Sequence, residues 1–126
     1  MNVVLWVLQI ILGLYFISVG VIHFIVPPGL PAPMQWMYDL TPILNYLSGT
    51  AEILGGLGLI LPGVTRIQTR LVPLAALGLI LVMLGAAIFH ITRGEFTNIV
   101  QNIFLAALLA IVAYGRWRWR PIPERA

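Results

Sequence analysis

Four long apolar segments constrain this chain more than any other feature of its sequence. Each has about the 17–25 residues that a transmembrane helix requires, and they run over residues 3–26, 43–61, 71–91 and 99–115. Hydrophobic residues make up 60% of the chain and charged residues 9%, whereas about 25% of a soluble domain is charged. The sequence therefore excludes a soluble globular domain. It predicts an all-α polytopic membrane protein, a four-helix transmembrane bundle that forms one domain over residues 1–126.

Proline and polar residues predict where the segments begin and end. Thr41-Pro42 has the pattern of an N-cap followed by proline at the first helical position, and Pro62-Gly63 is expected to end the second helix. Asn98 and Gln101 have the spacing of an N-cap and its partner three residues later. The outer loop 27–42 is rich in proline. We expect it to lie on the membrane surface or, as an alternative, to cover a cavity as a lid.

Arginine distribution predicts the orientation in the membrane. Arg66 and Arg70 lie between the second and third segments, and four more arginines follow the fourth: Arg116, Arg118, Arg120 and Arg125. In a four-helix chain these two regions share one side, which the positive-inside rule makes cytoplasmic. We therefore expect a multi-pass protein of the cell inner (plasma) membrane with both termini in the cytoplasm. The arginines themselves are interpreted as membrane anchors at the segment ends.

Several functional classes are excluded or disfavoured by what the sequence lacks. The chain has no cysteine, so it cannot by itself carry out thiol chemistry or hold an iron–sulfur cluster. No set of nucleophile, base and orienting group is visible, so a stand-alone enzyme is not predicted. A soluble basic face that could bind nucleic acid is also missing. The expected partners are the lipid bilayer and either other membrane subunits or further copies of the chain.

Glu52 is the most informative polar residue, because it lies near the middle of the second apolar segment. A charged side chain at the centre of a transmembrane helix costs roughly 2.5–3.5 kcal/mol on insertion scales, so such residues mark candidate functional sites. At about 100° per residue, Glu52 shares a stripe about 60° wide with Asn45, Gly49 and Gly56. Glycines allow a neighbouring backbone to approach closely. This face is therefore predicted to pack against protein.

Other polar residues are expected at depths that would let them meet Glu52: Tyr15, His23, Asn45, His90 and Asn102. All but Tyr15 belong to the outer half, and Glu52 lies about two turns deeper than Asn45. Tyr15 lies near the midplane and would join only if it borders the same gap. Converging faces would form a polar pocket that binds a head group and passes protons. The structural alternative is that these residues are struts between helices, snorkelling groups or packing groups.

Three stretches of sequence resemble the DoxX-like family of small four-helix membrane proteins: Gly20-Val21-Ile22-His23-Phe24, the run from Gly49 to Leu59, and Leu61-Pro62-Gly63. The resemblance covers nearly the whole chain and is most specific around Glu52. It implies an association with membrane redox or oxidative-stress complexes, and so contact with a quinone or a redox partner. By this resemblance Glu52, His23 and His90 become the candidate family residues. The missing cysteines argue against direct sulfur transfer.

Two functions fit these observations best. One is an accessory subunit of a redox-linked membrane complex, and the alternative is a protein that binds a quinone or another small lipophile around Glu52, with electrons supplied by a partner. A haem held by His23 and His90 is a lesser alternative. Another is a small transporter or proton path through Gln9, His23, Glu52 and Tyr15, which Phe16 would interrupt.

Overall fold

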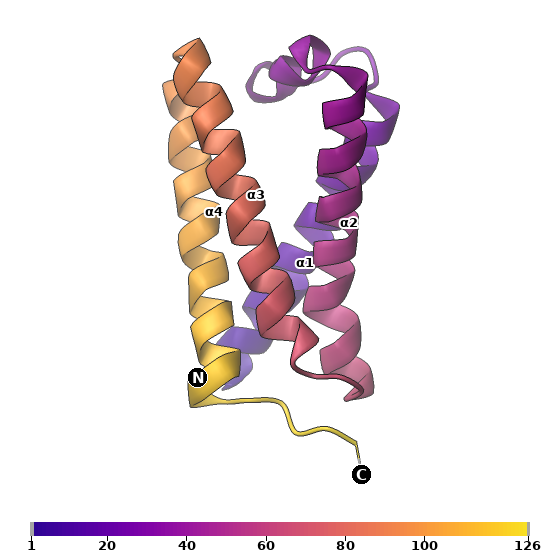
Figure 1. Cartoon of the computed structure of the whole chain (residues 1–126), viewed down its shortest axis with the longest axis vertical. Coiled ribbons are helices and arrows are strands. Elements are labelled where there is room, and N and C mark those ends of the chain that lie inside the picture. The colour runs from indigo at the N-terminus through magenta and orange to yellow at the C-terminus, as the bar shows by residue number, and fades with distance from the viewer. Residues whose placement is uncertain (1, 126) are drawn as a thin grey trace.

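Four long helices dominate the computed structural model, which describes residues 2–125: α1 (Asn2–Ile25), α2 (Pro42–Thr65), α3 (Leu71–Arg93) and α4 (Phe96–Tyr114). Each helix is long and apolar enough to cross a membrane. Figure 1 shows that the helices run along the long axis, with the α1–α2 connection at one end and both ends of the chain at the other. We call these the lid end and the terminal end. The predicted all-α, four-helix fold is confirmed.

Two helices, α2 and α4, differ from their predicted bounds by more than two residues at one end. Pro62 does not end α2, which continues to Thr65 and stops where Arg66 adopts left-handed backbone angles (φ 58°, ψ 32°). A proline is tolerated inside a transmembrane helix because neighbouring groups can satisfy the carbonyl that it frees. Helix α4 begins at Phe96, so Asn98 and Gln101 lie inside it and the predicted capping pair is wrong. The prediction at Thr41 is confirmed, since its hydroxyl accepts from the backbone N–H of Leu44.

Glycines bring α1 and α2 into close contact along their length. A Cβ atom at Gly20 would lie 2.8 Å from the carbonyl oxygen of Gly49, and one at Gly56 would lie 2.6 Å from that of Gly13. Only glycine permits such an approach of two backbones. Because Glu52 lies between Gly49 and Gly56 on the same face, it is held against α1. The prediction that this face packs against protein is confirmed.

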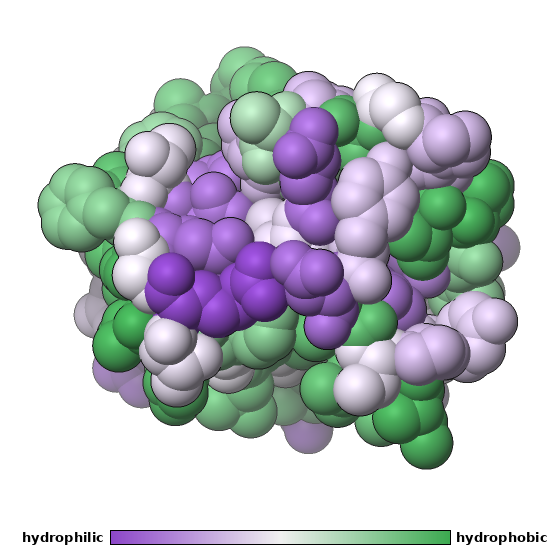
Figure 2. Space-filling view, turned by 90° about the horizontal axis from the view of Figure 1, so that it is seen from above, coloured by the Kyte–Doolittle hydropathy of each residue, from purple (hydrophilic) through white to green (hydrophobic). Residues whose placement is uncertain are grey.

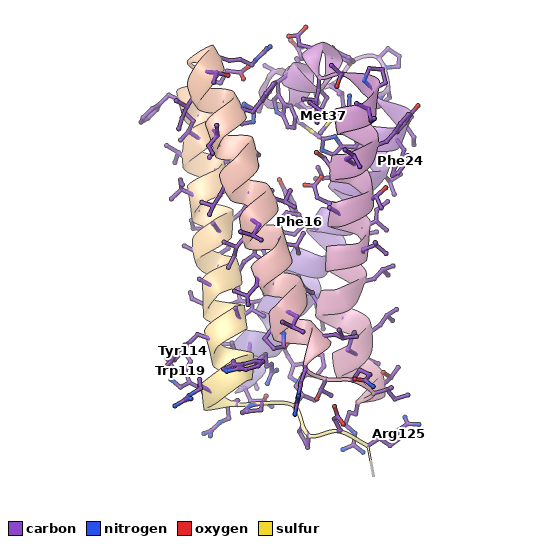
Figure 3. All side chains as sticks on the ribbon, viewed as in Figure 1. Phe16, Phe24, Met37, Tyr114, Trp119 and Arg125 are labelled. Carbon is purple, nitrogen blue, oxygen red and sulfur yellow. The ribbon has the colours of Figure 1, made fainter. Side chains whose placement is uncertain are left out.

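The apolar core fills the middle of the bundle and its terminal half. Phe16, Leu59, Leu79 and Leu109 are each at most 1% exposed within it, and Figure 3 shows Phe16 between the helices at mid-height. Toward the lid end the α1–α2 pair and the α3–α4 pair diverge (Figure 1). The core cluster stops short of this end, and a cavity lies beyond it.

A short 3-10 helix, η1 (Ala32–Asp39), covers the lid end. Its residue Met37 is 1% exposed and points down between the helix pairs (Figure 3). Three long helices hold the loop by polar contacts: Asn45 Nδ2 donates to Met37 O at 3.1 Å, Asn98 Nδ2 donates to Pro33 O at 3.0 Å, and Arg93 Nη2 lies 2.8 Å from Asp39 Oδ2. The structure thus favours the lid over a loop that only lies on the membrane surface.

A view onto the lid end shows hydrophilic residues gathered across the middle and hydrophobic residues around them (Figure 2). This arrangement suits a bundle whose outward faces contact lipid and whose polar groups lie inside.

At the terminal end the chain forms one π-helical turn, η2 (Gly115–Trp119), and Arg125 N donates to Arg66 O at 2.7 Å. The C-terminal segment therefore crosses beneath the α2–α3 connection.

Candidate functional site

A cavity of about 670 Å³ lies beneath the lid, between the two helix pairs. Its size falls within the range of roughly 300–1,000 Å³ typical of small-molecule sites. The structure brings most of the predicted site residues together on its wall: Tyr15, His23, Glu52, His90 and Asn102. Apolar side chains from all four helices and from the lid make up most of the remainder, for example Val19, Met34, Leu47, Val82, Phe89 and Leu105.

His23 and Glu52 form a buried pair at the inner wall of the cavity. His23 Nε2 lies 3.0 Å from Glu52 Oε2, and the two side chains are 3% and 5% exposed. No described donor is aligned on Oε2 with hydrogen-bond geometry, so this oxygen keeps bonding capacity although it touches the imidazole. A carboxyl group in this position needs a proton, a cation or a ligand.

Asn45, the remaining predicted site residue, lies behind His23 and connects it to the lid. Its Oδ1 is 2.8 Å from His23 Nδ1. Its Nδ2 donates to two carbonyl groups of the lid segment, Met37 O and Leu40 O. Those two carbonyls fix the orientation of the amide, because only the NH₂ group can donate to them. The oxygen of Asn45 must then accept a hydrogen bond from the N–H at Nδ1 of His23.

The protonation of the pair follows from this contact. With a proton on Nδ1, His23 offers Glu52 either the Nε2 lone pair or, as imidazolium, a second N–H. Two unprotonated acceptors 3.0 Å apart would repel each other. The contact between His23 and Glu52 therefore holds one proton, carried either by the carboxyl or by the imidazole. It is a proton-sharing pair at the wall of a cavity.

His90 lines the opposite wall and is held from outside the cavity. Its Nδ1 lies 2.8 Å from Glu95 Oε1, to which Arg93 Nε also donates at 2.9 Å. The Arg93 guanidinium and then the imidazole of His90 hold the pKa of Glu95 below its ordinary value. These contacts orient the ring of His90, and its edge-to-face contact with Trp36 completes its setting (4.8 Å between centroids).

The geometry does not suit a haem shared by His23 and His90. The indole of Trp36 packs against both imidazoles, at 5.7 Å and 4.8 Å between ring centroids, and both nitrogens of His23 already have partners. Within residues 2–125, no group of three or more His, Cys, Asp or Glu side chains is placed to hold a metal ion.

Among the residues of the cavity wall that sequence reasoning missed are Trp36, Asn98 and Gln101. Gln101 Nε2 donates to the hydroxyl of Tyr15 at 3.1 Å, which brings Tyr15 to the site although it is turned away from His23 along α1. Helical spacing could have revealed Asn98, because it lies one turn before Asn102 on the same face. The assignment of Asn98 to an N-cap concealed that it shares a face with Asn102. No pattern in the sequence could have placed Trp36, which belongs to the lid.

Gln9 is not part of the lid-end site. Its Nε2 donates to Leu59 O at 2.9 Å, and its Oε1 accepts from Nε of Arg116 at the terminal end. Leu12 and Phe16, 2% and 0% exposed, fill the space between Gln9 and the cavity. A polar path from Gln9 to Glu52 is therefore blocked. The interpretation of Arg116 as a surface anchor is also wrong, because the residue is 3% exposed.

Comparison with known proteins identifies one relationship. A family model described as the DoxX-like family matches residues 7–112, which include α2 and α3, most of α1 and α4, and every residue of the lid-end site. Neither the curated proteins nor the solved structures contain a significant match to this chain.

Proposed function

Because this chain belongs to the DoxX-like family and is a small multi-pass integral membrane protein, we propose that its lid-end cavity binds a lipophilic molecule with a small oxygen-bearing head group. A quinone is the ligand class that fits best. The head group would lie beside Glu52, His23 and Asn102, and the tail would lie along the apolar wall. This is the quinone or small-lipophile function that the sequence offered as the alternative to an accessory subunit.

One observation carries the proposal. Asn102 Nδ2 is buried and has no hydrogen-bond partner, and Glu52 Oε2 is buried with only the contact to His23; both side chains line the same cavity. Leaving a buried polar group unpaired costs about 1–3 kcal/mol, and native proteins keep few of them. One of these atoms can accept a hydrogen bond and the other can donate one. A ligand hydroxyl that accepts from Asn102 and donates to Glu52 would satisfy both.

Quinone chemistry matches this pair of groups. A quinone carbonyl can accept from the Asn102 amide and from a protonated Glu52, and a quinol hydroxyl can donate to the carboxylate. The proton shared by His23 and Glu52 lies where the oxygen of a bound quinone or quinol would gain or lose a proton. No cofactor-binding motif is visible in the sequence, so the electrons for any redox change would come from a partner protein.

If the chain were only an accessory subunit, the same polar residues would have a structural role. Its polar groups would be used up in contacts between helices, as Gln9 is with Leu59 O. Glu52 and Asn102 retain free bonding capacity, which favours the binding role. The two roles combine if the chain supplies a quinone site to a redox-linked membrane complex, and this combined role is part of the proposal.

We place the lid end outside and the terminal end in the cytoplasm of the cell inner (plasma) membrane. The support is the distribution of arginine, with Arg66, Arg70 and the four arginines after α4 at the terminal end. The single arginine of the lid end, Arg93, pairs with Asp39 and Glu95. The positive-inside rule favours this orientation. A quinone site near the outer face would then open under the lid.

Quenching of tryptophan fluorescence tests the binding proposal directly. The indole of Trp36 lines the cavity, and quinones quench indole emission on contact. The full chain in mild detergent would be titrated with a ubiquinone analogue that carries a ten-carbon tail. We expect saturable quenching in the wild type, abolished by Trp36→Phe. Glu52→Ala and Asn102→Leu should each weaken the affinity by about 5- to 100-fold, because each removes one hydrogen bond to the head group.

Ser18→Ala is the matched control, since Ser18 is exposed on α1 and its hydroxyl bonds only to Leu14 O. It should bind the analogue as the wild type does. Non-saturable quenching, or equal affinity in the wild type, Glu52→Ala and Asn102→Leu, would rule out quinone binding at this site. A ten-carbon alcohol that competes with the analogue would instead assign the site to lipophiles with a hydroxyl head.

A further inference from the structure

A second cavity, of about 190 Å³, lies at the terminal end, away from the quinone site. It is lined by the start of α3 and by the segment after α4: Thr69, Arg70, Pro73, Arg116, Trp117, Pro121 and Ile122. Its volume corresponds to about six water molecules at roughly 30 Å³ each. Arg116, Trp117 and Ile122 lie beyond residues 7–112, the part of the chain that matches the family.

Arg116 is the unusual member of this cavity. It is 3% exposed, and no carboxylate of the described residues lies within ion-pair distance of it. Its Nε donates to Gln9 Oε1, and its Nη1 donates to Asn2 Oδ1 and to Arg120 O, both at 2.7 Å. All of these acceptors are neutral, and Trp6 covers the guanidinium at 5.2 Å. A buried guanidinium without a counter-ion is costly.

Arg116 lines this cavity, and part of its guanidinium is unsatisfied. Nη2 of Arg116 is buried and has no hydrogen-bond partner, so two of the five N–H donors of the side chain remain unused. An oxyanion in the cavity would accept from Nη2 and neutralise the charge. Arg70 adds a second cation and Thr69 a hydroxyl on the same wall. Arginine pairs and hydroxyl groups are typical of sites that bind phosphate.

We propose that this cavity binds a phosphate group through Arg116, with Arg70 and Thr69 as secondary contacts. The exposed rings of Trp117 and Trp119 beside it, 54% and 48% exposed, are typical of the membrane–water interface. At that depth the phosphate group can come from a phospholipid head or from a free anion. An ordinary membrane anchor would leave its arginine exposed, as Arg118 is.

The test compares ligands with and without a phosphate group. The purified full chain would be titrated with dioctanoyl phosphatidylglycerol, with dioctanoylglycerol, and with sodium phosphate against sodium chloride at equal ionic strength, and apparent affinities would be taken from the shift in thermal unfolding. We expect the phospholipid or phosphate to stabilise the wild type and dioctanoylglycerol and chloride to have little effect. Stabilisation by the lipid alone assigns the site to a head group, and stabilisation by inorganic phosphate assigns it to any phosphate.

Charge-matched variants separate this site from general surface electrostatics. Arg116→Gln should weaken the apparent affinity by at least about tenfold, Arg70→Gln should weaken it less, and Arg118→Gln should leave it unchanged. Should Arg116→Gln fail to fold, Arg70→Gln against Arg118→Gln decides, because both residues are exposed. Equal losses in Arg70→Gln and Arg118→Gln, equal stabilisation by dioctanoylglycerol, or no stabilisation by either phosphate ligand would overturn the proposal.

Discussion

Asn45 determines which nitrogen of His23 carries a proton, because its Oδ1 lies 2.8 Å from Nδ1 while its Nδ2 is bound to the lid backbone. This contact links three parts of the molecule. The lid fixes the amide, the amide fixes the imidazole, and the imidazole shares a proton with Glu52. Movement of the lid would thus change the hydrogen bonding of His23. The lid and the lid-end site are therefore coupled through Asn45 and His23.

The first prediction concerns the ring of His23. Nitrogen-15 NMR of selectively labelled protein should show Nδ1 protonated, in either the neutral or the imidazolium form, because Asn45 can only accept at that position. Asn45→Leu should release this constraint and allow the Nε2-protonated tautomer. A wild-type spectrum with an unprotonated Nδ1 and a proton on Nε2 would contradict the proposed pair.

The second prediction separates stability from binding at Asn102. Replacing it by leucine removes a buried donor that has no partner, so Asn102→Leu should raise the free energy of unfolding of the ligand-free protein by about 1–3 kcal/mol. The same change should weaken quinone binding. Denaturant titration in detergent measures the first effect. If the variant is instead less stable by a similar amount, Nδ2 has a structural partner and the binding argument loses its support.

The third prediction tests the close contact of α1 and α2. Gly20→Ala places a methyl group 2.8 Å from Gly49 O and 2.7 Å from Ile53 Cγ1, and overpacking of this kind typically costs about 1–3 kcal/mol. Gly78→Ala is the control, since a Cβ there meets no atom within 4 Å. The thermal unfolding temperature should fall for Gly20→Ala and stay unchanged or rise for Gly78→Ala. Equal effects would mean that the helices do not meet at Gly20.

The fourth prediction is a pH dependence at the lid end. The pKa of Glu95 is lowered, first by Arg93 and then by His90, so its carboxylate contributes stability above the ordinary value of 4.5 and loses it as the pH falls through the lowered pKa. Glu95→Gln should therefore unfold at a lower temperature than the wild type at neutral pH. The difference in unfolding temperature should close as the pH falls below 4.5, the ordinary pKa of the carboxyl group, and through the lowered pKa.

Glu124→Gln provides the comparison for Glu95→Gln, because Glu124 is exposed and takes part in none of the ion pairs of the described residues. Its unfolding temperature should match the wild type across the same pH range. A difference between Glu95→Gln and the wild type that persists unchanged at low pH would show that the ion pairs of Glu95 are not its cause.

The fifth prediction concerns orientation. The natural chain has no cysteine, so single cysteines can be introduced without further changes. Ala32→Cys, exposed on the lid, should react with a membrane-impermeant maleimide in intact cells. Glu124→Cys, exposed at the terminal end, should react only after the membrane is opened. The reverse labelling pattern would place the lid in the cytoplasm and overturn the proposed orientation.

Much of this fold could be predicted from the sequence, because a bilayer restricts the choices. Apolar segments of this length must be helical to satisfy their backbone groups, and glycines seven residues apart marked the face of α2 that α1 approaches. Glu52 stood out for the same reason, since a carboxyl in hydrocarbon demands an explanation. Predictions based on one local signal were less secure. Pro62 did not stop α2, and Asn98 did not cap α4 but donates to Pro33 O of the lid.

The sequence by itself determined that this is a four-helix membrane protein with an ionisable group at membrane depth, since periodicity and hydropathy act within one helix. Contacts between helices were decided only by the tertiary structure. Trp36 reaches the cavity from the lid, Gln101 brings Tyr15 to it, and Arg116 turns inward to Gln9. These positions depend on how helices pack and where loops fold back. No periodic pattern in a single segment records such information.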